Sequence, residues 1–331
     1  MGNLLKGLAG DWFLRGMVAA VLVASFLPDL GRSGGWLRLD ALLDYGIALV
    51  FFLHGIGIPT EQMRAGLGNW RLHFVVQGFT FAVFPLLFLL LQWPLSLLLP
   101  PMLLLGFLYL AVLPSTITSS VAMTAIARGN VPAAIFNATL SSLLGIVLTP
   151  LLVALFMQSA PQGLHVDVGA AMQKIASFIL LPFVAGQLLH RRLGRWFSAR
   201  KRWTSLMDRG VILLLVLSSF SDSVAAGLWT DYGASLLLLT LAGSSVLLAI
   251  VLALSTWVAR TLRFNKEDEI TAVFCGSKKT LAAGLPMAKV LFGTHPGLGL
   301  IVLPIMFYHQ LQLIVCAAMA QRYARRENSE Q

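Results

Sequence analysis

Ten apolar stretches run through this chain of 331 residues, and each is long enough to form a helix that crosses a membrane. Such a helix needs about 20 residues to span the ~30 Å of hydrocarbon in a bilayer. The composition agrees, because 57% of the residues are hydrophobic and 11% are charged, whereas about 25% are charged in soluble domains. We therefore predict an all-α, multi-pass membrane protein. The predicted spans are residues 12–28, 39–58, 70–92, 97–126, 131–157, 171–190, 208–228, 233–260, 270–292 and 297–321.

The positions of the positive charges predict the orientation of these spans. If the amino terminus is cytoplasmic, eighteen of the 24 Lys and Arg residues fall in cytoplasmic segments, and only Arg32, Arg38 and Lys174 fall on the other side. Cytoplasmic loops of membrane proteins carry an excess of Lys and Arg. Both termini are therefore predicted to be cytoplasmic. The same bias accounts for the net charge of +10, so we predict no nucleic-acid partner.

An Arg-rich segment around residues 190–207 is predicted to be a loop that divides the ten spans into five and five. Because five is odd, the second half enters the membrane inverted, as in transporters built from inverted repeats. We place the repeats at residues 1–165 and 166–331. The fourth and ninth spans, which correspond in the two repeats, are both interrupted, at residues 114–120 and at residues 276–280. Paired interruptions predict a binding site, because unwound backbone exposes N–H and C=O groups there.

Polar side chains near these interruptions are the candidate ligands of a substrate or coupling ion. A single Ser or Thr in a membrane helix usually bonds to its own backbone, whereas the amide of Asn137 is expected to face the interior of the bundle. Gln77, Asp222 and His309 are polar groups in other spans. The candidates other than lysines are Thr118, Ser119, Ser120, Asn137, Ser141, Gln77, Ser277, Thr280, Asp222 and His309.

Lys278 and Lys279 are the most unusual residues of the predicted membrane interior. A cation at this depth costs at least about 2.5–3.5 kcal/mol, so other groups must compensate for it. Two interpretations follow: a site for an anion or a titratable gate, or a structural pairing with Asp222 or with a backbone carbonyl. Lys289 lies late in the same span, and we expect its ammonium to extend to the membrane interface.

The chain resembles the bile acid:sodium symporter family along nearly its whole length, within the branch of the human seventh-member carrier and its bacterial homologues. The resemblance is carried by short motifs, which read FFLHGIG at 51–57, LHFVVQ at 72–77 with Pro85, ARGN at 127–130, AIFN at 134–137, LGIVLTP at 144–150, FSD at 220–222, FCGSKK at 274–279 and YH at 308–309. It implies ten helices in two inverted repeats, with a panel of spans 1, 2, 6 and 7 and a core of spans 3–5 and 8–10. It also implies that the broken fourth and ninth helices cross in the core.

The resemblance further implies how sodium would be held. In sodium-coupled members, two ions are bound near the crossing by a Ser-Asn pair, by hydroxyls one helix later, by a Gln on the third span and by a Glu-x-Gly-x-Gln stretch. Ser119, Ser120 and Asn137 are the candidate sodium ligands that this implies here, with Gln77 beside them. The chain departs from the pattern at the last motif, where Phe274 and Lys278 flank Gly276. The negative charge that would neutralise sodium is missing, and an ammonium lies nearby, which disfavours two bound sodium ions.

We therefore predict a secondary active transporter of a small organic anion, working by alternating access in the bilayer of the inner (plasma) membrane of a bacterium. The sodium site is degraded with a Lys side chain, that of Lys278 or Lys279, in its place, so transport is expected to be proton-linked or uncoupled, and Na⁺ and H⁺ both remain candidate coupling ions. No other cofactor is predicted. The alternative is a regulatory or scaffold protein that keeps the fold but transports nothing. An enzyme is not expected, because the sequence has no HExxH, GxSxG or Asp-rich prenyl-diphosphate motif.

Overall fold

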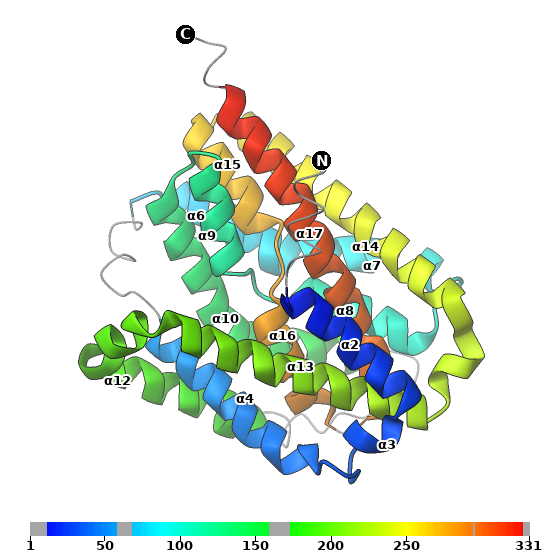
Figure 1. Ribbon diagram of the computed structural model, residues 1–331. Coiled ribbons are helices and arrows are strands. Elements are labelled where there is room, and N and C mark those ends of the chain that lie inside the picture. Colours follow the sequence, from blue (N-terminus) through cyan, green and yellow to red (C-terminus); the bar gives the residue numbers. More distant parts are fainter. Residues whose placement is uncertain (1–11, 58–67, 159–172, 294, 327–331) are drawn as a thin grey trace. The chain divides into compact units, whose positions relative to one another are not determined.

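The computed structural model describes residues 12–57, 68–158, 173–293 and 295–326, and helices are the regular elements of this part of the chain (Figure 1). The chain forms two compact units. Unit 1 comprises Met1–Ile58, Gly163–Ser235 and Ala282–Val302. Unit 2 comprises Pro59–Gln162, Leu236–Leu281 and Leu303–Gln331.

Unit 1 is built from two pairs of helices that lie side by side, α4 with α12 and α2 with α13 (Figure 1). Close packing of α4 and α12 depends on glycine. A side chain at Gly55 would collide with the carbonyl of Phe183, and one at Gly186 with the carbonyl of Phe52. Small residues at such contacts let the backbones of membrane helices approach closely. The helices of unit 1 are α2 (Trp12–Phe26), α3 (Pro28–Gly31), α4 (Leu39–Ile56), the π-helix η2 (Ala176–Leu180), α12 (Leu181–Ala199) and α13 (Lys201–Ala225).

Unit 2 contains the two interrupted spans, in which α8 is followed by α9 and α15 by the first residue of α16. Within this unit, α15 packs against α6, α9 and α10. Three helices have residues in both units: α14 (Leu228–Thr261), α16 (Leu281–Phe292) and α17 (Leu298–Arg326). The remaining helices of unit 2 are α6 (Trp70–Gly78), the π-helix η1 (Phe79–Val83), α7 (Phe84–Ser96), α8 (Pro101–Val112), α9 (Thr118–Ile126), α10 (Val131–Gln158) and α15 (Lys266–Gly276).

One buried carboxylate joins the starts of three helices in unit 2. Asn69, Asn130 and Asn265 cap α6, α10 and α15 by accepting a hydrogen bond from a backbone N–H in the first turn, as Asn commonly does at helix starts. Asp268 accepts from the side-chain amides of Asn69 at 2.6 Å and Asn130 at 2.9 Å. The carboxylate also lies in the first turn of α15, where the helix dipole favours a negative charge. These contacts fix where α15 begins, and so where it ends at the interruption.

The apolar helices confirm an all-α membrane protein. Within the described residues, five helices are long and apolar enough to cross a bilayer, namely Trp70–Ser96, Val131–Phe156, Arg202–Ala225, Ser235–Thr261 and Leu298–Arg325. Trp12–Phe26, Leu42–Ile56 and Pro101–Val112 are shorter apolar helices. The inverted ten-helix repeat and its panel and core remain predictions, and the proposed repeat boundary at 165/166 lies outside the described residues.

The predicted Arg-rich loop around residues 190–207 is wrong. Helix α12 continues to Ala199 and α13 begins at Lys201, so almost the whole segment is helical. Arginine and lysine form helices well, and nothing requires a membrane helix to end where its apolar residues end. The charges here mark the ends of two helices rather than a loop.

Candidate functional site

The two interrupted helices meet in unit 2. The chain is not helical between α8 and α9 or at residues 278–280 between α15 and α16. The backbone N–H of Thr280 donates to the carbonyl of Pro114 at 3.0 Å. The hydroxyl of Ser115 donates to the carbonyl of Cys275 at 2.7 Å, and that of Ser120 to the carbonyl of Phe274 at 3.3 Å. Each interruption therefore satisfies backbone groups of the other, as buried backbone in a membrane requires.

The end of α8 exposes carbonyl groups because its next N–H groups are absent or used elsewhere. Pro114 has no N–H, and the N–H of Ser115 donates to the hydroxyl of Ser141 at 2.9 Å. The carbonyl of Val112 accepts from the Thr149 hydroxyl at 2.8 Å. The carbonyls of Ala111 and Leu113 remain, and both accept from Nζ of Lys279, at 2.8 and 2.7 Å.

A third carbonyl for Lys279 comes from the π-helix η1. The N–H of Phe84 donates to the carbonyl of Phe79, five residues earlier, and the next residue, Pro85, has no N–H. The carbonyl of Thr80 is thereby left without its usual helical donor, and it accepts from Lys279 Nζ at 2.8 Å. The Phe84 ring lies 4.0 Å from Nζ, in cation–π geometry.

Lys279 is therefore fully enclosed and fully hydrogen-bonded. Its side chain is completely buried, and the three N–H groups of its ammonium match three carbonyl oxygens. Gln312 holds the backbone of the same residue, because its Oε1 accepts from the Lys279 N–H at 2.9 Å and its Nε2 donates to the Lys279 carbonyl at 2.8 Å. Of the two structural partners considered for these lysines, the backbone carbonyl is the one observed.

The ammonium of Lys278 has fewer hydrogen-bond acceptors than that of Lys279 among the described residues, although Lys278 is also buried. Its Nζ donates to the carbonyl of Ser119 at 2.7 Å and lies 5.5 Å from the centre of the Phe274 ring. Ser119 is the second residue of α9, whose start has no side-chain cap. Lys278 thus places a positive charge beside the N-terminus of α9, which itself attracts anions.

Two of the four candidate sodium ligands, Gln77 and Asn137, bind each other. Nε2 of Gln77 donates to the backbone carbonyl of Asn137 at 3.0 Å and to its side-chain oxygen at 3.3 Å. The Asn137 amide donates to the carbonyl of Ala133 at 3.0 Å. Oε1 of Gln77 is buried and has no hydrogen-bond partner among the described residues. The amides of Gln77 and Asn137 are thus brought together, whereas Ser119 and Ser120 donate to Thr116 and Phe274, and the role of all four as ion ligands remains a prediction.

The other predicted site residues are spread over several environments. Ser277 donates to the carbonyl of Val273 in its own helix at 2.6 Å, the Ser119 hydroxyl to that of Thr116 at 3.4 Å, and Thr118 is exposed at the start of α9. His309 lies 3.0 Å from the Gln312 amide. Asp222 belongs to unit 1, where it accepts from the N–H and hydroxyl of Ser33 at 2.6 and 3.0 Å.

The expectation for Lys289 is wrong. Its side chain is 6% exposed, and its buried Nζ lies 4.0 Å from Oδ1 of Asp40 in unit 1. Neither atom has a hydrogen-bond partner among the described residues. The aliphatic stem of Lys289 does not carry the ammonium to an exposed position, because Asp40 attracts it at the start of α4.

Gln312 and the carbonyl of Thr80 are parts of this site that the polar pattern did not reveal. The sequence offers a signal for Thr80, since a proline five residues later removes the N–H that a π-helix would supply. Gln312 could have been found as one of two amides, with Gln310, that follow His309 within an apolar span. Such an amide needs a partner in the membrane interior.

Long apolar helices, two of them interrupted around buried lysine side chains, define an integral membrane protein of the transporter class. The chain belongs to the SBF-like CPA transporter family, whose pattern matches residues 11–325. It is 47% identical over 321 residues to the uncharacterized protein PA2026 of Pseudomonas aeruginosa, covering 96% of this chain and 94% of that one. It is 46% identical over 315 residues to the putative symporter YfeH of Escherichia coli, covering 95% and 93%. Sodium/bile acid cotransporter 7 of Rattus norvegicus is 30% identical over 316 residues, covering 95% and 92%. The resemblance to this branch is confirmed.

Proposed function

We propose that this chain is a secondary transporter of an organic anion, working by alternating access, in which Lys279 takes the place of a bound coupling cation. One observation carries the proposal: three backbone carbonyls lie 2.7–2.8 Å from its ammonium where the interrupted helices meet. Backbone carbonyls of interrupted helices are the groups that hold coupling ions in transporters. The name of the rat relative, a sodium/bile acid cotransporter, supports an amphipathic anion as the substrate class.

A sodium ion beside this ammonium would be repelled. Two unit charges 4 Å apart repel each other by about 4 kcal/mol at the effective dielectric constant of a protein. In the sequence, a carboxylate that could offset this repulsion is missing from the FCGSKK motif, where Phe274 takes the position of the Glu in sodium-coupled members. Transport that is proton-linked or uncoupled therefore fits this chain better than transport with two sodium ions.

Lys278 is the residue that we assign to the substrate anion. Lys279 uses all three of its N–H groups on carbonyls, whereas a single carbonyl, that of Ser119, accepts from Lys278 within the described residues. The ammonium of Lys278 and the uncapped start of α9 are both electropositive. Together they can hold a carboxylate or sulfonate, and buried lysines are able to exchange protons during a transport cycle.

Uptake into proteoliposomes tests this function. The purified chain is reconstituted, a radiolabelled bile acid is the probe, and sodium is replaced by potassium at constant pH. We expect uptake that does not depend on sodium and that is lost in Lys278→Ala. Sodium-dependent uptake that Lys278→Ala leaves unchanged would contradict the proposal. If neither bile acids nor a panel of smaller organic anions are taken up, the non-transporting scaffold becomes the better interpretation.

A gain-of-function variant provides a second test. Phe274→Glu with Lys278→Gln rebuilds the Glu-x-Gly-x-Gln pattern around Gly276. We expect sodium to raise the unfolding temperature of this double variant, because the new carboxylate offsets the repulsion by Lys279 and an ion that binds only the folded state stabilises it. The parent chain and Lys278→Gln alone are the controls, and neither should respond. An equal sodium response in the parent chain would contradict the proposal.

A further inference from the structure

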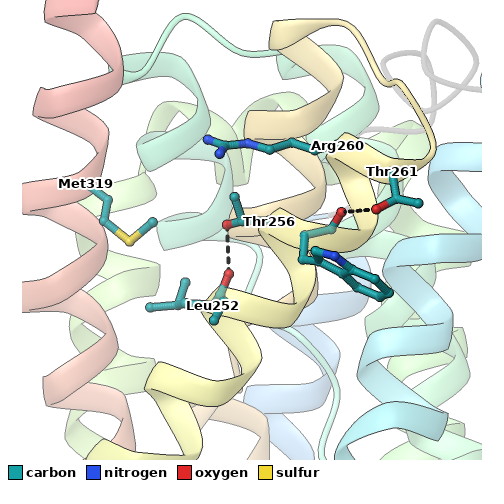
Figure 2. A pocket seen from close by; sticks show the side chains of 7 residues that line it. Leu252, Thr256, Arg260, Thr261 and Met319 are labelled. Atoms are coloured by element: carbon teal, nitrogen blue, oxygen red, sulfur yellow. Dashed lines mark hydrogen bonds between the residues drawn. The ribbon is translucent and has the colours of Figure 1, made fainter.

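A groove in unit 2, distinct from the meeting point of the interrupted helices, lies between α14 and α17 (Figure 2). It has a volume of about 410 Å³, and its wall includes Leu252, Trp257 and Met319. Trp257 is 64% exposed, so the groove opens to the surroundings of the helices. Both helices are among those long and apolar enough to cross a membrane. The surroundings of the groove are therefore lipid along much of its length.

The wall of the groove offers little to a polar ligand. The hydroxyl of Thr256 donates to the carbonyl of Leu252 at 2.7 Å, and that of Thr261 to the carbonyl of Trp257 at 2.9 Å, as the dashed lines in Figure 2 show. Hydroxyls that bond to their own helix present mainly carbon to the groove. The groove thus suits a hydrocarbon chain.

One end of the groove carries a positive charge. Figure 2 shows the side chain of Arg260 extending above Thr256 on the side of α17. Its Nε donates to Oε1 of Glu269 at 3.1 Å, and the same oxygen accepts from the Tyr323 hydroxyl at 3.1 Å. Glu269 therefore fixes the direction of the guanidinium through Nε, and within the described part of the chain the two NH₂ groups at its tip remain for another acceptor. Guanidinium groups bind phosphate well because they offer several donors in one plane.

The position of Arg260 in the sequence indicates which side of the membrane this end of the groove faces. Arg260 ends the span at residues 233–260, and Arg263 and Lys266 follow it. The distribution of Lys and Arg predicts that this end is cytoplasmic, where anionic lipids attract basic residues. Exposed Trp257 is also typical of the level of the lipid headgroups.

We propose that this groove binds an anionic phospholipid of the cytoplasmic leaflet, with one acyl chain against Leu252, Trp257 and Met319 and the phosphate against Arg260. The charge at one end and the carbon wall along the rest match the two parts of such a lipid. Phosphatidylcholine also has a phosphate, but its choline places a positive charge near Arg260. A lipid with net negative charge is therefore preferred, and the site does not depend on what the transporter carries.

Native mass spectrometry of the full chain in detergent tests this site. Phosphatidylglycerol and phosphatidylcholine with identical acyl chains are the probes, together with inorganic phosphate alone. We expect phosphatidylglycerol to be retained about fivefold more than phosphatidylcholine, since one basic residue near a membrane contributes about that factor. Equal retention of the two lipids would overturn the proposal. Competition by inorganic phosphate at equal concentration would also overturn it, because the site would then recognise an anion rather than a lipid.

Two variants separate lipid binding from the salt bridge. Arg260→Gln removes the charge and should abolish the preference for phosphatidylglycerol. Glu269→Gln breaks the same salt bridge but keeps Arg260, and it should retain or increase the preference. Ala253→Trp, which fills the groove, should release the lipid while Arg260 stays in place. If Glu269→Gln loses the preference as fully as Arg260→Gln does, or if Arg260→Gln keeps it, the assignment of the phosphate to Arg260 is wrong.

Discussion

Lys279 in unit 2 and Lys289 in unit 1 are both buried, 0% and 6% exposed, but their ammonium groups have very different partners. Three backbone carbonyls accept from Lys279, whereas the ammonium of Lys289 has, among the described residues, only a carboxylate oxygen of Asp40 4.0 Å away. The difference arises from the backbone. Interrupted helices and a π-helix leave carbonyls unbonded around Lys279, so a cation can be held there without a carboxylate. Around Lys289, the structure offers a partial ion pair instead. We infer that Lys279 stabilises its unit and that Lys289 does not.

The largest effect that would test this comparison is expected for Lys279→Met. Methionine fills similar space, but it leaves the carbonyls of Thr80, Ala111 and Leu113 without a donor. A buried polar group that loses its partner costs about 1–3 kcal/mol, so the loss should be at least about 3 kcal/mol, seen as a lower unfolding temperature in detergent. Lys278→Met, which removes one bond to a carbonyl, is the control and should cost less. Equal losses would show that the carbonyls around Lys279 have no special role.

A smaller effect is expected for Gln312→Leu. This change leaves both the N–H and the carbonyl of Lys279 unpaired, two groups rather than three, at a cost of about 2–6 kcal/mol by the same reasoning. Gln312→Glu keeps the acceptor for the N–H and loses the donor to the carbonyl, so its unfolding temperature should lie between those of Gln312→Leu and the parent. If Gln312→Leu and Gln312→Glu are equally unstable, the Gln312 side chain does not stabilise the Lys279 backbone through two separate hydrogen bonds.

Thr149→Val tests a single carbonyl at the end of α8. The side chain keeps its shape but no longer donates to Val112, and we expect a loss of about 1–2 kcal/mol in thermal unfolding. Ser142→Ala is a matched control on the same helix, because the Ser142 hydroxyl bonds to the carbonyl of Ala138 in its own helix. It should change stability little. A larger loss for Ser142→Ala would contradict the inference that the end of α8 depends on donors from α10.

Much of the architecture could be predicted from the sequence, because membrane helices must be both long and apolar. The helical interruptions were predictable for a related reason: Pro114, Gly276 and the polar runs beside them cannot continue an apolar helix without leaving groups unpaired. The predicted loop at 190–207 failed because charge marks the end of a membrane span but does not end a helix.

The partners of the lysines could not be predicted in the same way. Thr80 and Lys279 are 199 residues apart, and the acceptor is a backbone carbonyl, which every residue possesses. Only the local loss of N–H donors, from Pro85 and Pro114, distinguishes these carbonyls from the rest. Lys278 and Lys279 both lie in the non-helical segment at 278–280, so helical geometry does not assign their directions, and the sequence does not say which of them meets the carbonyls.

The smallest changes in stability are expected for variants of Lys289 and Asp40, and whether each change is a gain or a loss is the informative result. Lys289→Met replaces an ammonium that has no hydrogen-bond acceptor among the described residues, and replacing such buried charges by apolar side chains is often neutral or stabilising. Asp40→Asn leaves the ammonium buried without its counter-charge, while an amide oxygen can still accept from the N–H of Gly34, as Oδ2 of Asp40 does at 2.9 Å. Because the Asp40 side chain is 40% exposed, this loss should be only about 1 kcal/mol.

The double variant of Lys289→Met and Asp40→Asn completes this test. If the ammonium is the destabilising group, Asp40→Asn costs nothing once Lys289 is methionine, so the two changes are not additive. The unfolding temperature of Lys289→Met should then equal or exceed that of the parent. A fall as large as that of Lys279→Met would mean that a carboxylate 4.0 Å away holds a buried lysine as well as three carbonyls do. The interrupted helices would then not be required to explain how this protein stabilises a buried ammonium group.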